Sequence, residues 1–137
     1  MKLRIPTLFV PILAGATLSE RAIACLGSLI GITFTGIVTS LVLGGGWHLP
    51  IIIAPMGASA VLIFAVPASP LAQPWPVIGG NIISTLIGLG VAQFVPEPAV
   101  AMGLGVSLAI AVMSLTRCLH PPGGAAVLPA VLQVNLH

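Results

Sequence analysis

Charged residues are scarce in this sequence: they make up 4% of 137 residues, four Lys or Arg and two Asp or Glu. Water-soluble domains carry about a quarter of their residues as charges, so a soluble globular fold is excluded. Hydrophobic residues account for 58% of the chain, and its mean hydropathy is +1.22. We therefore expect an integral membrane protein whose solvent is the lipid bilayer.

Other shortages exclude whole classes of function. No basic run is present to bind nucleic acid. The two carboxylates, Glu20 and Glu97, fall at expected interfaces, and no nucleophile has a histidine and an acid near it in sequence, so the chain is not expected to be an enzyme. Cys25 and Cys118 lie far apart without metal-ligand spacing, which predicts small buried apolar side chains and neither metal nor cofactor.

Long apolar runs are what the sequence does contain. Residues 22–43 are long enough to cross a hydrocarbon core of roughly 30 Å as a helix. Further runs are a thin span or broken helix at 50–66, spans at 77–95 and 99–119, and a short run at 125–134. The proline-rich residues 67–76 predict a loop. The expected fold is a single all-α transmembrane domain, 1–137, with about four spans plus broken or short helices.

The first twenty residues permit two interpretations. Residues 1–20 form either an interfacial arm or a cleavable signal segment with a small-residue cut site. We favour the arm, followed by a helix that begins at Thr17, because Glu20 stands three residues later as in a capping box.

The placement of charges predicts an orientation. Lys2, Arg4 and Arg21 precede the first span, Arg117 closes the fourth, and Glu97 lies between the third and fourth. The positive-inside rule then places the N-terminus and Arg117 together in the cytoplasm, which predicts a multi-pass protein of the inner (cytoplasmic) membrane.

Small and aromatic residues mark expected contacts. Gly27, Gly31 and Thr35 share one face of the first helix, a spacing that lets another segment approach closely. Trp47 and Trp75 stand where aromatic rings mark membrane interfaces.

Two segments resemble each other. Residues 55–62 and 121–128 align without gaps and share Pro, Gly, Ala, Val and Leu. In the expected orientation they would enter from opposite faces, as an inverted repeat requires, although small residues also recur by chance in membrane proteins.

Both segments predict a helix start with free amide donors. Proline is favoured in the first helical turn, and glycine leaves N–H groups uncovered, so two such ends meeting near the midplane would bind an anion. The candidate binding residues in the two segments are Gly57, Ala58 and Ser59, and Pro121, Pro122, Gly123, Gly124 and Ala125.

Three polar side chains are further candidates. His120 precedes the second segment and, as a histidine, changes charge near neutral pH; it is either a proton carrier or a polar helix end. Arg117 adds positive charge one turn earlier, or simply caps a cytoplasmic helix end. Asn81 would donate its side-chain amide to a ligand or bond between helices.

Four groups of residues, 54–62, 69–74, 79–81 and 115–125, resemble in order the HPP family of integral membrane proteins. That family is named for a His-Pro-Pro motif, here His120-Pro121-Pro122. The resemblance covers the chain from about Leu18 onward and implies a small multi-span membrane domain. Some members, in cyanobacteria and plastids, are implicated in nitrite transport.

The resemblance implies a transporter or channel for a small monovalent anion such as nitrite. Because a chain of this size is too small to enclose a pathway alone, we expect such a transporter to be a homo-oligomer. The alternative is a non-transporting structural or regulatory membrane subunit. Two departures matter. The family usually continues into another hydrophobic helix, whereas this chain stops at His137, so we expect it to be incomplete or to rely on a partner. Asn81 stands where relatives often have histidine, which would alter proton coupling or selectivity.

Overall fold

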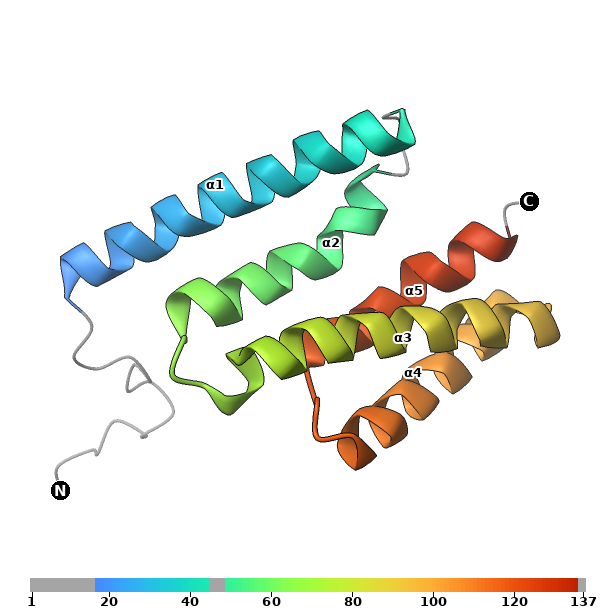
Figure 1. Ribbon diagram of the computed structural model, residues 1–137. Helices are drawn as coiled ribbons and strands as arrows, with labels where there is room; N and C mark the ends of the chain where they lie inside the picture. Colours follow the sequence, from blue (N-terminus) through green and yellow to red (C-terminus); the bar gives the residue numbers. More distant parts are fainter. Residues whose placement is uncertain (1–16, 45–48, 136–137) are drawn as a thin grey trace, which may run out of the picture.

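The computed structural model describes residues 17–44 and 49–135, and the described part is an all-α bundle (Figure 1). Its elements are α1 Leu18–Leu43, α2 Leu49–Ala60, a π-helical segment η2 Val61–Ala65, a short 3₁₀ turn η3 Pro70–Ala72, α3 Pro74–Phe94, α4 Pro98–Leu115 and α5 Pro121–Asn135. Among these, α1, α3 and α4 are long and apolar enough to cross a membrane, and Ile53–Ala65 is a shorter apolar helix. The expected multi-span membrane bundle is confirmed.

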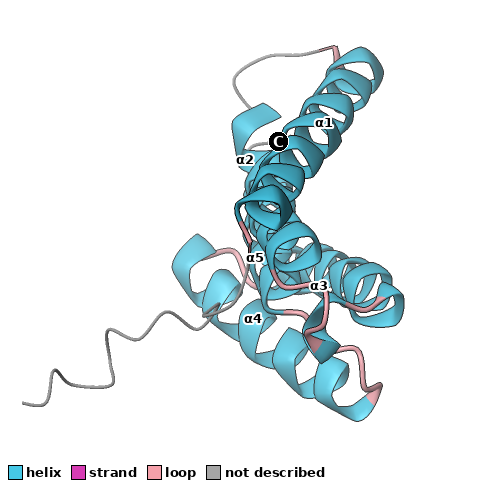
Figure 2. Ribbon diagram, turned by 90° about the vertical axis from the view of Figure 1, so that its left-hand side faces the viewer, coloured by secondary structure: helices cyan, strands magenta, loops and turns pink. Residues whose placement is uncertain are grey.

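Successive helices run in opposite directions, and α5 occupies the centre. It lies between the α1–α2 pair and α4, and it packs against α2, α3 and α4 (Figure 2). The α1–α2 pair and the α4–α5 pair run in opposite senses, which is the arrangement that an inverted repeat requires (Figure 1).

The first helix begins and packs as its sequence predicts. The Thr17 hydroxyl accepts from the Glu20 N–H, and the Glu20 carboxylate accepts from the Thr17 N–H, so the capping box is confirmed. The Phe64 ring lies on the glycine face of α1: a Cβ at Gly27 would lie 2.6 Å from it, and one at Gly31 3.4 Å. These glycines therefore allow η2 to approach α1 closely.

Several expected boundaries were wrong. The loop predicted at 67–76 ends early, because α3 begins at Pro74. Proline is tolerated in the first turn of a helix, since the N–H groups of that turn form no hydrogen bond within the helix. The fourth helix ends at Leu115 rather than 119, and Arg117 follows with a φ of 56°. Cys118 is buried as expected, but Cys25 is exposed on α1. Trp47 and residues 1–16 lie outside the described residues.

The core is built from small residues that bring backbones together. A Cβ at Gly88 of α3 would lie 2.9 Å from both the Val127 carbonyl oxygen and the Ala130 Cβ of α5. Gly105 of α4 is covered by Val127 in the same way, at 2.6 Å. Because lipid is as apolar as leucine, close packing of this kind, rather than exclusion of water, holds such helices together.

Substituting Gly88 tests this packing. Gly88→Leu should destabilise the bundle by about 1–3 kcal/mol, because backbone and Cβ atoms of α5 cannot move aside as a flexible side chain would. Gly90→Leu on the same helix is the matched control, since a Cβ there meets nothing within 4 Å. Thermal unfolding in detergent measures both, and equal melting temperatures would contradict the packing described.

The orientation is open to a labelling test. The start of α1 and the end of α4 lie at the same end of the bundle, and Glu97 caps α4 at the other (Figure 1). In a background without native cysteines, Arg117→Cys should react with a membrane-impermeant maleimide only from the cytoplasmic side, and Glu97→Cys only from the outside. Labelling of both from one side would overturn the arrangement.

Candidate functional site

His120 joins three separate segments of the chain inside the bundle. It is fully buried, with an exposed fraction of 0%. Its Nδ1 lies 2.8 Å from the carbonyl oxygen of Leu71 in η3, and its Nε2 lies 2.9 Å from Oγ of Ser59, the next-to-last residue of α2. Residues 61 and 49 positions apart in sequence therefore meet at one side chain.

The partners determine which nitrogen carries hydrogen. A carbonyl oxygen only accepts, so Nδ1 of His120 must be the protonated nitrogen that donates to Leu71. In the neutral imidazole Nε2 is then an acceptor, and the Ser59 hydroxyl donates to it. A second proton on His120 would reverse this bond and release the Ser59 hydrogen for another acceptor.

Glycines make room for this histidine. A Cβ at Gly80 of α3 would lie 2.7 Å from the His120 Cβ, and one at Gly123 of α5 would lie 2.9 Å from the Gly80 carbonyl oxygen. Gly80 is the seventh residue of α3, about 9 Å along the helix from its first residue. His120 therefore lies about 6 Å from the midplane, where the two motifs were expected to meet, on the side where α3 begins.

The two repeat segments do meet, but not as two helix starts. Ser59 of the first contacts His120, which directly precedes the second. Gly57, however, lies in the interior of α2, which continues through Pro55 to Ala60, so its N–H faces a carbonyl of its own helix. The predicted helix start at residues 55–59 is wrong, because one proline removes a single bond without ending the helix. Ala58 is exposed on the outer surface of α2.

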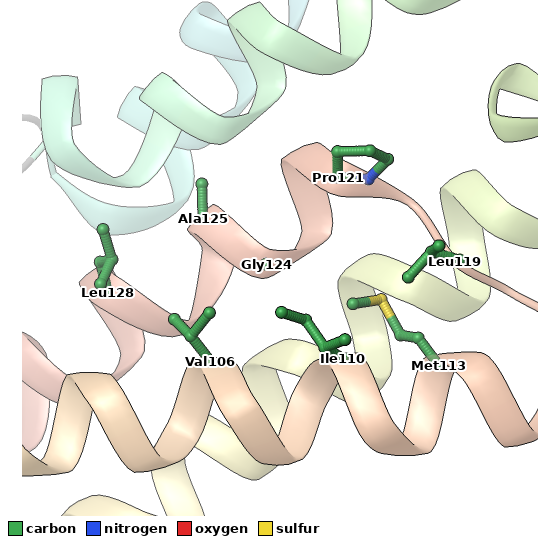
Figure 3. Close-up of a pocket in the computed structure, with 8 residues that line it drawn as sticks. All are labelled: Val106, Ile110, Met113, Leu119, Pro121, Gly124, Ala125 and Leu128. Atoms are coloured by element: carbon green, nitrogen blue, oxygen red, sulfur yellow. The ribbon is translucent and has the colours of Figure 1, made fainter.

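The second segment begins a helix as expected, but its first three residues have no free N–H group. Pro121 and Pro122 have no N–H, and the Gly123 N–H donates to the His120 carbonyl oxygen at 2.8 Å. Gly124 and Ala125 instead line a groove of about 540 Å³ whose other walls are apolar side chains of α4 and α5 (Figure 3). Three of the five expected residues thus provide no free amide donor, and anion binding by this segment stays a prediction.

The remaining candidates lie apart from His120. Arg117 is exposed in the α4–α5 connection, outside any helix, so it does not share a helical face with His120. The side-chain N–H of Asn81 donates to the Val77 carbonyl oxygen at 2.7 Å, and its buried oxygen Oδ1 has no hydrogen-bond partner within the described part of the chain. The Asn81 atom left without a partner is thus an acceptor, whereas a donor was expected.

The contact of His120 with Leu71 and the cavity beside Asn81 were not predictable from the sequence. A carbonyl partner leaves no signal in residue types, because every residue has a carbonyl. Within residues 17–44 and 49–135, no group of His, Cys, Asp or Glu is placed to hold a metal ion.

Comparison with known proteins agrees with this architecture. A transmembrane protein of Dictyostelium discoideum is 44% identical over 92 residues, which is 64% of this chain and 32% of that protein. A second transmembrane protein of the same organism is 41% identical over 88 residues, 61% of this chain and 28% of its own length. The chain thus spans about a third of the length of these relatives. No solved structure matches.

A family model, described as the transmembrane region of HPP proteins, matches residues 13–137. The match includes the buried His120, the Pro-Pro start of α5 and the Ser59 segment that His120 contacts. This chain is a multi-pass integral membrane protein and belongs to the HPP transmembrane family.

Proposed function

We propose that this chain is the membrane domain of a transporter or channel for a small monovalent anion such as nitrite, acting as a homo-oligomer in the inner membrane. The observation that carries the proposal is the buried pair of His120 and Ser59. A titratable side chain inside a membrane bundle is costly, and such residues mark ion and proton pathways. The implication of other HPP proteins in nitrite transport supports the choice of solute.

The pair is built to pass a proton rather than to hold an anion permanently. The Ser59 hydroxyl can donate to His120 Nε2 or accept from it, so it turns to accept when Nε2 takes up a proton from outside the pair and turns back when that proton leaves. Nδ1 keeps its bond to Leu71 in both states, which fixes the ring while the proton on Nε2 comes and goes. Proton exchange at Nε2 of His120 would supply the proton that moves with each anion, so that the anion need not cross the bilayer core as an ion.

Uptake of nitrite into proteoliposomes tests the proposal. Uptake above that of protein-free liposomes is expected for the wild type. Ser59→Ala should lower it about tenfold, because losing a buried hydrogen bond of about 1.4 kcal/mol disables the exchange at Nε2.

Ser84→Ala is the matched control for Ser59→Ala. Ser84 is equally buried, but its hydroxyl contacts Met113 Sδ and not His120. Its uptake should stay within a factor of about two of wild type, the effect of a bond worth about 0.5 kcal/mol. Equal uptake by wild type, both variants and protein-free liposomes would remove the transport function and leave the structural subunit.

Crosslinking in native membranes separates the two functions by their partners. The apolar side chains of α1 are mostly exposed, and no α1 residue is buried in the described chain. A transporter of this size needs further copies to enclose a pathway, so a ladder of homo-oligomers is expected. Capture of one larger, different protein instead would favour the regulatory or structural subunit.

A further inference from the structure

A second polar feature lies deeper in the bundle than His120. A cavity of about 330 Å³ opens between the α1–α2 pair and the α3–α5 pair. Thr85, on its wall, lies about 16 Å along α3, which is roughly 30 Å long, so the cavity is close to the midplane. The polar residues on its wall are Thr35, Thr39, Asn81, Thr85 and Gln133.

One polar side chain on the cavity wall, Asn81, has a buried acceptor atom. The Asn81 nitrogen points at the Val77 carbonyl oxygen, 2.7 Å away, and a carbonyl cannot donate; the amide is therefore oriented with its oxygen away from that bond. Oδ1 is buried and has no hydrogen-bond partner among the described residues. A buried acceptor left unpaired costs about 1–3 kcal/mol, which a ligand that donates a hydrogen would recover.

Two of the hydroxyls on the cavity wall, those of Thr35 and Thr85, already donate their hydrogens to backbone carbonyls. Thr35 donates to the Gly31 carbonyl oxygen and Thr85 to the Asn81 carbonyl oxygen, each at 2.8 Å. What both can offer to the cavity are oxygen lone pairs. Together with Oδ1 of Asn81, the Thr35 and Thr85 oxygens give the cavity wall three hydrogen-bond acceptors.

Charge excludes a bare anion from this wall. None of the residues that line the cavity is charged or titratable, so the lining has no positive charge to offset that of a negative ion. Moving an uncompensated ion into so apolar a setting costs many kcal/mol. The protonated form of the anion is a neutral acid, and its O–H group can donate the hydrogen bond that Oδ1 of Asn81 does not receive from the described residues.

We infer that the cavity binds the transported solute as a small neutral acid, with its O–H donating to Oδ1 of Asn81. The inference rests on the proposed function and specifies the form in which the solute crosses. One proton joins the anion to form the O–H bond on one side, and the same bond breaks on the other side. Each anion therefore carries one proton, and no net charge moves.

The position of His120 fits this path. Ser59 and Pro55 are four residues apart on α2, so they share a face one turn apart, and Pro55 lines the cavity. On α3, Gly80 faces His120 and the next residue, Asn81, lines the cavity. The proton-exchanging pair therefore lies about one helical turn from the acid-binding wall, toward the cytoplasmic end.

The test measures nitrite and protons together in proteoliposomes with a pH dye inside. Imposing a nitrite gradient should acidify the lumen faster than in protein-free liposomes, with one proton for each nitrite determined chemically. Clamping the membrane potential with potassium and valinomycin should not change the rate. Nitrate, whose acid is too strong to be protonated near neutral pH, should give no excess uptake.

Variants locate the effect. Asn81→Leu removes the acceptor at similar volume and should lower the excess uptake about tenfold. Gln93→Leu is the control: it removes an amide from the exposed surface of α3, outside the cavity wall, and should leave uptake unchanged. Size-exclusion profiles show whether each variant is folded. If Asn81→Leu does not fold, the number of protons that enter with each nitrite in the wild type tests the inference alone.

The outcomes separate this inference from the proposed function. Nitrite uptake without matching acidification, or uptake that Asn81→Leu leaves intact, overturns the neutral-acid site while transport stands. Absence of any uptake above protein-free liposomes overturns both.

Discussion

The structure depends on the hydrogen bonds of one polar side chain, His120, which is fully buried away from solvent. Inside a bilayer, an unmet hydrogen-bonding group costs several kcal/mol, so a buried imidazole must find partners within the protein. His120 has two such partners, the carbonyl oxygen of Leu71 in η3 and the hydroxyl of Ser59 in α2. Those two bonds hold the α1–α2 half of the chain against the α3–α5 half at the end where α5 begins.

Glycine makes the same junction possible from the other side. Because Gly80 and Gly123 have no side chains, the backbones of α3 and α5 lie against each other there, and His120 fills the space next to Gly80. Farther along the pair of helices, Gly88 repeats the arrangement against Val127. The glycine packing and the histidine contacts therefore depend on each other, because α3 and α5 must pack closely for His120 to reach Ser59 and Leu71.

The fold was predictable where it follows from hydropathy and local signals. Long apolar runs gave the spans, and Thr17 with Glu20 marked the start of α1, because both depend on neighbouring residues only. The continuation of α2 through Pro55 was not predictable, since packing against α1 and α5 holds the helix together despite the proline. The importance of His120 and Ser59 was visible as motifs, but their contact was not, because it joins residues 61 positions apart. The orientation of the Asn81 amide depends on one backbone carbonyl and has no trace in residue types.

The two prolines that open α5 have a consequence for how the protein is made. A helix start normally leaves bare N–H groups that must face water, but Pro121 and Pro122 have none, so Pro122 and Gly123 can be buried against α3 at no such cost. Synthesis proceeds from the N-terminus, and Ser59 and Leu71 are in place before His120 leaves the ribosome. Because His120 stands at the start of α5 and makes both bonds, these bonds between the two halves of the described bundle form only once α5 has been made and packed.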